Sequence, residues 1–102
     1  MPTVRHELGE IEAILYGHPR ITEAALVAIP DDEVTNRLKA FIVTDEPNSL
    51  AARQVRDYCR ERLPKYMVPE FVEFREALPR TSTGKVDRNV LLRQEREREN
   101  PE

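Results

Sequence analysis

AALVAI at residues 24–29 is a continuous apolar run that ends at Pro30. A run of this length without a polar interruption is typical of a β-strand that is covered on both faces. A second run, LKAFIVT, follows at residues 38–44 and is interrupted only by Lys39. The residues between the two runs are mostly polar, so we expect the two strands to form an antiparallel hairpin with a long loop.

Helices and a third strand are expected on either side of this hairpin. The spacing of apolar residues predicts one helix over residues 8–17 and another from about 49 to 63. FVEF at residues 71–74 predicts a short third strand, and a last helix follows it from residue 87 to residue 92. The expected order is α-β-β-α-β-loop-α, which is an α+β domain with a small three-stranded sheet flanked by helices.

Single residues mark the expected ends of these helices and of the domain. Gly17 is placed to end the first helix, and Asn48 or Ser49 to begin the second as its N-cap. Asp87 is the expected N-cap of the last helix. The domain is expected to occupy residues 1–92. We expect the charged tail, residues 93–102, to fray because it has no apolar stripe.

Length and composition exclude several classes of protein. The chain has 102 residues, a formal net charge of −3, 39% apolar residues and 34% charged residues, as expected for one soluble globular domain. The mild acidity argues against nucleic-acid binding, and the single cysteine excludes a disulfide framework or a cysteine-rich zinc site. His6 and His18 have no metal-ligand spacing, so no metal site is expected. No segment approaches the roughly 20 apolar residues of a membrane span, and no targeting segment is visible, so we expect a cytoplasmic protein.

The loop TSTGK at residues 81–85 carries the most informative chemistry. Gly84 frees the backbone, and Lys85 supplies a point charge with three donors that can approach phosphate or carboxylate oxygens. The loop is not a Walker A loop, because Pro79 stands at the first glycine of that motif and Val86 at its Mg²⁺-binding hydroxyl. From residue types alone, an ordinary surface loop remains an alternative interpretation.

Other polar side chains have a structural interpretation beside a chemical one. Cys59 lies on the apolar stripe of the second helix and is expected to be a small buried residue rather than a reactive thiol. His18 stands beside a proline at a helix end, where it is expected to compensate the helix dipole or to be solvated. Glu7, Glu10 and Glu12 are interpreted as the acidic first turn of the first helix. The second helix is expected to carry a salt-bridged face that is exposed to solvent, made of Arg53, Arg56 and Arg60 with Asp57 and Glu61.

Two motifs are more specific than these single residues, ELGEIE at residues 7–12 and LPRTSTGKVDR at residues 78–88. With the segments HPRITEAALVAIPDD, LKAFIV and LPKYMVPEFVEF between them, they closely resemble the C-terminal subdomain of acyl-adenylate-forming ligases. This superfamily includes acyl-CoA synthetases, nonribosomal peptide synthetase adenylation domains and firefly-type luciferases. The resemblance extends from about Val4 to Leu92.

The resemblance implies a reaction in two steps. Such enzymes make an acyl-AMP from a carboxylate and Mg·ATP, release pyrophosphate, and pass the acyl group to a thiol. The thiol belongs to CoA or to the phosphopantetheine arm of a carrier protein, and both acceptors remain open here. The resemblance makes this chain the mobile lid of the enzyme. Lys85 is the implied catalytic residue that bridges the carboxylate and the α-phosphate, and Thr83 and Gly84 form its loop.

The resemblance also implies a partner, because ATP and the acid are bound mainly by a large N-terminal domain. The hinge aspartate of the family and its ATP-binding loop are expected outside this chain, and Thr3 stands about where the family has a glycine before the first helix. We therefore expect no activity from the chain without the large domain. A noncatalytic module of the same fold, which binds a carrier protein or a large subunit, is the alternative.

Overall fold

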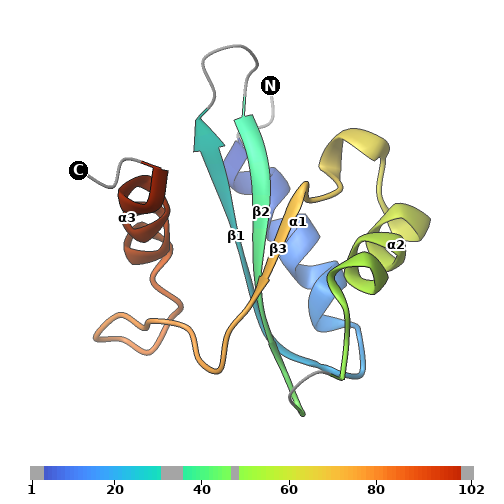
Figure 1. Cartoon of the computed structure of the whole chain (residues 1–102), viewed down its shortest axis with the longest axis horizontal. Helices are drawn as coiled ribbons and strands as arrows, with labels where there is room; N and C mark the ends of the chain where they lie inside the picture. Colours follow the sequence, from blue (N-terminus) through green and yellow to red (C-terminus); the bar gives the residue numbers. More distant parts are fainter. Residues whose placement is uncertain (1–3, 31–35, 47–48, 100–102) are drawn as a thin grey trace.

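The protein has helices on both faces of one β-sheet (Figure 1). The structure is a computed structural model that describes residues 4–30, 36–46 and 49–99. In chain order the elements are α1 (Val4–Tyr16), β1 (Ile21–Pro30), β2 (Asn36–Thr44), α2 (Ala52–Arg62), the short 3-10 helix η1 (Lys65–Met67), β3 (Phe71–Phe74) and α3 (Arg88–Glu99). This order confirms the predicted α+β class and the predicted sequence of helices and strands.

The sheet is mixed, with the strand order β1-β2-β3. β1 and β2 pair antiparallel, which confirms the predicted hairpin, and β3 lies parallel to β2. Parallel neighbours need a crossover connection, and α2 with η1 provides it. Both hairpin strands are longer than predicted, so their connection shortens to residues 31–35, which lie outside the described residues.

Each face of the sheet carries its own buried cluster, which explains why β1 and β2 are apolar at consecutive positions. Side chains alternate along a strand, so neighbouring residues enter opposite clusters. The cluster under α1 and α2 contains Leu8, Ile11, Leu15, Ile21, Ala24, Leu26, Ala40, Ile42, Val55, Cys59 and Met67. The cluster under α3 contains Ala25, Val27, Ile29, Phe41, Val43, Leu78 and Leu91. Among the described residues, no helix is long and apolar enough to cross a membrane.

One of the predicted helix ends is confirmed and another needs correction. Gly17 directly follows the last residue of α1, as predicted, and its N–H donates to the carbonyl of Ile14 at 3.0 Å. The N-cap of α2 is Ala51, whose N–H donates to the side chain of Gln54 at 2.8 Å. Ser49 instead donates its hydroxyl to a carboxylate oxygen of Asp45 at 3.4 Å, and Asn48 lies outside the described residues.

The start of α3 confirms the predicted cap. Asp87 Oδ1 accepts the N–H of Val90 at 3.2 Å, as an N-cap side chain does in the first turn of a helix. The far end of α3 differs from the prediction, because the helix continues to Glu99 through most of the segment that is expected to fray.

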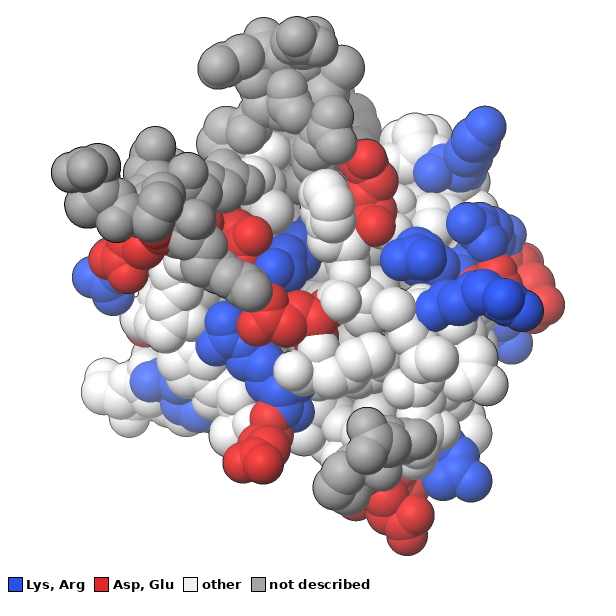
Figure 2. Space-filling model, in the orientation of Figure 1, with Lys and Arg blue, Asp and Glu red and all other residues white. Residues whose placement is uncertain are grey.

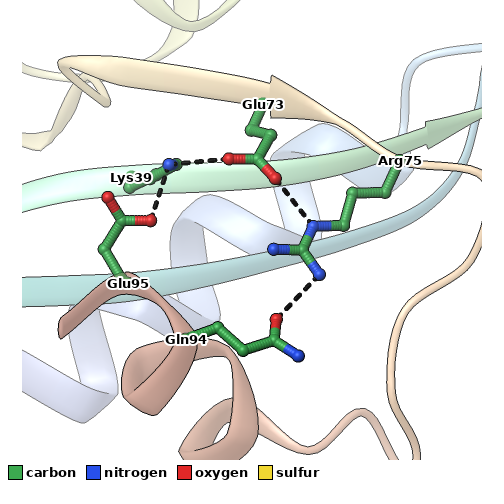
Figure 3. Close-up of polar contacts among 5 residues, drawn as sticks. All are labelled: Lys39, Glu73, Arg75, Gln94 and Glu95. Carbon is green, nitrogen blue, oxygen red and sulfur yellow. Dashed lines mark hydrogen bonds and ion pairs between the residues drawn. The ribbon is translucent and has the colours of Figure 1, made fainter. Parts of the chain in front are cut away.

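A buried lysine explains why the helix continues. Lys39 is 6% exposed, and its Nζ lies 2.8 Å from Glu73 Oε1 on β3 and 2.7 Å from Glu95 Oε1 on α3 (Figure 3). Arg75 extends the network, because its Nε donates to Glu73 and its Nη1 donates to Gln94 at 2.9 Å. A buried charge without partners is costly, so these contacts fix the second half of α3 on the sheet.

Removing one charge from this network is expected to loosen α3. Glu95→Gln keeps the size of the side chain but weakens its bond to Lys39, and we expect the free energy of unfolding to fall by about 1–3 kcal/mol. Denaturant unfolding measures this loss. Glu97→Gln on the exposed side of the same helix is the control and should change stability by less than about 0.5 kcal/mol. Equal effects of the two substitutions would contradict an anchoring role for Glu95.

Candidate functional site

The candidate site is a small hairpin between β3 and α3, here called the Lys85 loop and comprising residues 79–87. Arg80 and Val86 form an antiparallel bridge at its base. Inside the bridge, the N–H of Thr81 donates to the carbonyl of Lys85 at 2.7 Å, and the N–H of Gly84 donates to the carbonyl of Thr81 at 2.9 Å. The predicted polar loop is therefore an ordered turn, and it lies on the α3 side of the sheet, away from α2 (Figure 1).

Gly84 allows this turn to form. Its φ of 88° lies in the left-handed region, where a side chain strains the backbone. An added Cβ would meet no atom within 4 Å, so the requirement for glycine is conformational and not one of space. The hydroxyls of Thr81 and Thr83 lie 2.9 Å apart, and the Thr81 hydroxyl oxygen accepts the N–H of Lys85 at 3.3 Å.

Lys85 itself is exposed at the turn. Within the described part of the chain, no ion pair or hydrogen bond holds its ammonium group. The backbone of this residue is fixed on both sides while its charge projects into solvent. Such an arrangement can deliver an ammonium group to an anion on another molecule.

Two ion pairs, one from the Lys85 loop and one from the residue that follows it, connect this region to the rest of the fold. Arg80 pairs with Glu23 of β1, and its Nη1 also donates to the carbonyl of Gly84 at 3.0 Å. Arg88 pairs with both carboxylate oxygens of Glu12 on α1, with Nε at 3.0 Å from Oε2. Glu12 Oε2 in turn accepts the N–H of Leu26 at 2.8 Å. The ELGEIE and LPRTSTGKVDR motifs, which are far apart in the sequence, are thus joined by a direct ion pair.

These two pairs are not predicted by the sequence pattern. The sequence pattern assigns Glu12 to an acidic first turn, whereas its structural partner is an arginine 76 residues away. Glu10 of the same set is exposed, and the side chain of Glu7 lies outside the described residues. A charged residue at the end of a buried strand, as Glu23 is, is the available signal for a partner from elsewhere in the chain.

Cys59 behaves as predicted. Its side chain is fully buried in the cluster under α1 and α2. Burial raises the pKa of the Cys59 thiol to about 11. The positive charge of the nearby Arg62 lowers this pKa, but by less than burial raises it. A thiol with such a pKa is protonated at neutral pH and poorly nucleophilic, so Cys59 is a packing residue.

His18 is more constrained than expected. Its ring packs edge-to-face against Tyr58 at 4.8 Å, and its Nδ1 accepts the N–H of Arg20 at 3.1 Å. Partial burial lowers the pKa of His18, and the charges of Arg62 and Arg20 lower it further. These effects favour the neutral ring, which argues against the predicted dipole-compensating cation.

The arginines of α2 form a solvent face, as predicted. Figure 2 shows basic side chains gathered over this helix, with acidic ones among them. Arg60 pairs with Asp57 at 2.6 Å, and Arg62 pairs with Glu61 at 3.2 Å. These exposed pairs contribute little to stability.

Comparisons with known proteins match this chain to one enzyme family and to several of its members. The family model described as the AMP-binding enzyme C-terminal domain matches residues 10–85. A linear gramicidin synthase protein of Brevibacillus parabrevis is 46% identical over 87 residues, which are 85% of this chain and 1% of that protein. The 2-methylpropanoate–CoA ligase CCL4 of Humulus lupulus is also 46% identical over 87 residues, 80% of this chain and 15% of that protein.

A solved structure supports the same relationship. The acyl-CoA synthetase of Brucella canis superposes with a TM-score of 0.81 at 29% identity, and the match covers 90% of this chain and 18% of that one. The chain therefore spans less than a fifth of the length of each of these relatives.

Proposed function

The chain belongs to the family of AMP-binding enzyme C-terminal domains, and on this basis we propose that it is the mobile catalytic lid of an AMP-forming ligase. In this proposal a separate large domain binds ATP and a carboxylic acid, and the chain closes over them for adenylate formation. The observation that carries the proposal is Lys85, an exposed ammonium group on a loop whose backbone is fixed by hydrogen bonds on both sides.

The chemistry of adenylation explains the need for such a lysine. A carboxylate oxygen attacks the α-phosphorus of ATP, a new P–O bond forms, and the bond to pyrophosphate breaks. Two anions must approach each other in this step, so a positioned cation lowers the barrier. Lys85 would contact the carboxylate and an α-phosphate oxygen, while the loop of Thr83 and Gly84 brings the backbone close to the partner domain.

A lid also explains why the lysine lies on an exposed loop. After the adenylate forms, Lys85 has to leave so that a thiol can attack the acyl carbon and displace AMP. Rotation of a small domain moves a loop in and out without changing its internal structure. The acceptor thiol is that of CoA or of a carrier protein's phosphopantetheine. The names of the relatives, a CoA ligase and a gramicidin synthase, are compatible with either.

Magnesium accompanies ATP in this proposal but is assigned to the large domain. Within the described ranges of this chain, no group of three or more His, Cys, Asp or Glu side chains is placed to hold a metal ion. In the proposal, the lid acts on the anionic oxygens through the ammonium group of Lys85.

The experiment that tests the proposal is carboxylate-dependent exchange between ATP and labelled pyrophosphate. We would use the large domain of the hop ligase CCL4 without its own C-terminal domain, with 2-methylpropanoate as the acid. The large domain, this chain, and a mixture of both are measured separately. A fusion of the two parts serves as a second form of the assay, in which weak association has no effect.

We expect exchange only when both parts are present, mixed or fused. The rate should rise with the concentration of this chain until the large domain is saturated. A fusion that exchanges no faster than the large domain alone would contradict the lid proposal. If binding were still measurable in that case, the result would favour the noncatalytic interaction module.

A further inference from the structure

Arg80 ties the Lys85 loop to strand β1 of the sheet. One end of its guanidinium pairs with Glu23 on β1, and Nη1 donates to the carbonyl of Gly84 at 3.0 Å. That carbonyl belongs to the peptide group that joins Gly84 to Lys85. The guanidinium therefore connects a strand of the core to the peptide directly before the lysine.

The backbone of β1 aims Glu23 at this arginine. The pairing of β1 with β2 shifts its register between Ile21 and Glu23, and Thr22 at the shift donates its hydroxyl to the carbonyl of Val43 at 3.1 Å. Irregularities of this kind re-aim the side chains beside them. Beyond the shift, Glu23 shares the face of Ala25, which belongs to the cluster under α3.

Arg80 holds the peptide group before Lys85, and Thr81 contacts the peptide groups on both sides of it. The N–H of Thr81 holds the carbonyl of Lys85 at 2.7 Å, and its hydroxyl accepts the lysine N–H at 3.3 Å. The peptide group that joins Gly84 to Lys85 is thus held at its carbonyl by Arg80 and at its N–H by the Thr81 hydroxyl, and the peptide group after Lys85 is held by the N–H of Thr81. Of these contacts, the bond from Arg80 connects the turn to a charged partner on another element.

We propose that Arg80, held in place by Glu23, is a positioning residue that sets where Lys85 presents its ammonium group. The inference rests on the proposed function, because it concerns the reach of the catalytic lysine. An ammonium group that stabilises a transition state must be placed to within about 1 Å, since misplacement on that scale costs up to about 100-fold in rate. The Arg80–Glu23 pair is partly exposed, with side-chain exposures of 45% and 25%, and pairs of this kind add little to global stability.

A positioning role for Arg80 predicts a loss of rate without a loss of stability, which a merely structural residue would not show. Arg80→Met should lower the maximal exchange rate by roughly 10-fold to 100-fold. The concentration of this chain that gives half the maximal rate and the thermal midpoint of the chain should both stay unchanged. Glu23→Gln should give a smaller loss in the same direction, and Arg80→Lys should recover part of the rate. Arg60→Met, which removes an exposed pair on α2, is the matched control and should leave the rate unchanged.

A double substitution tests whether Arg80 acts through Lys85. If it does, adding Arg80→Met to Lys85→Ala should lower the rate no further, because the group being positioned is already absent. A further loss equal to that of Arg80→Met alone would overturn the inference, as would a parent-like rate for Arg80→Met. A different result would contradict the proposed function itself, namely a Lys85→Ala chain that retains the parent rate.

Discussion

Lys85→Ala is expected to lower the rate of acyl-adenylate formation by a factor of ~10²–10³ when the chain is combined with a large domain. The substitution removes the one group of the lid that is proposed to contact both the carboxylate and the α-phosphate. Lys85 is exposed, so the chain should keep its fold and its affinity for the large domain. Pyrophosphate exchange measures the loss, and circular dichroism checks the fold.

Two controls make this result specific. Lys65→Ala removes an exposed lysine of η1 and should leave the exchange rate unchanged. Thioester formation from a preformed acyl-adenylate should also continue in the Lys85→Ala chain, because the proposed lid withdraws the lysine for that step. A Lys85→Ala chain that exchanges at the parent rate would remove the assignment. An equal loss in both steps would indicate a general defect of the lid.

Ile42→Asp is expected to unfold the domain. Ile42 is fully buried in β2, in the cluster under α1 and α2, so the new carboxylate would have no polar partner. An unpaired buried charge costs roughly 4–5 kcal/mol or more, which is comparable to the total stability of many small domains. Leu26→Asp, at a fully buried position of β1, should have the same effect. Far-UV circular dichroism and a denaturant titration measure the outcome.

The matched control lies on the neighbouring strand. Phe71 of β3 is 42% exposed, so Phe71→Asp places the same carboxylate where water can solvate it. That chain should remain folded, with a loss of stability well below that of Ile42→Asp. A folded and cooperative Ile42→Asp chain would show that the assigned core is incorrect.

The local pattern of the chain is sufficient to predict the hairpin and the helix order. Pro30, which ends β1, follows a run that is apolar at every position, and a run of this length is typical of a strand covered on both faces. Asp87 has the side chain and the position of an N-cap, and its carboxylate does accept a helical N–H. These features depend on near neighbours in the sequence.

Long-range pairs between charged residues cannot be predicted in the same way. Lys39 is visible as an interruption in an apolar strand, but its partner Glu95 lies 56 residues later in a segment without an apolar stripe. Helix α3 therefore extends further than its own sequence indicates. The Arg80–Glu23 and Arg88–Glu12 pairs of the site cannot be predicted for the same reason. When the two partners of an ion pair lie on different elements, no characteristic spacing in the sequence marks them.

The N-cap of α2 illustrates a different limit. Asn48 and Ser49 have the side chains that prefer such a position, yet the helix begins after Ala51 and uses the side chain of Gln54. Ser49 bonds to Asp45 in the preceding turn instead. Both bonds form, and the sequence does not indicate that the hydroxyl of Ser49 serves the turn before the helix instead of capping it.

Restoring an ammonium group chemically at position 85 tests directly whether this group carries the activity of the lid. The chain with Lys85→Cys carries an exposed thiol at position 85, whereas Cys59 is buried and its raised pKa of about 11 protects it from alkylation. Treatment of the folded chain with 2-bromoethylamine then places an ammonium group of nearly lysine length at position 85. The measurement is the pyrophosphate exchange rate with the large domain before and after this treatment.

We expect the Lys85→Cys chain to be as defective as Lys85→Ala, and aminoethylation to restore a large part of the parent rate. Treatment of the parent chain with the same reagent should change nothing. A Lys85→Cys chain that is active before treatment, or one that stays inactive after complete modification, would contradict the assignment of Lys85 as the catalytic lysine of this lid.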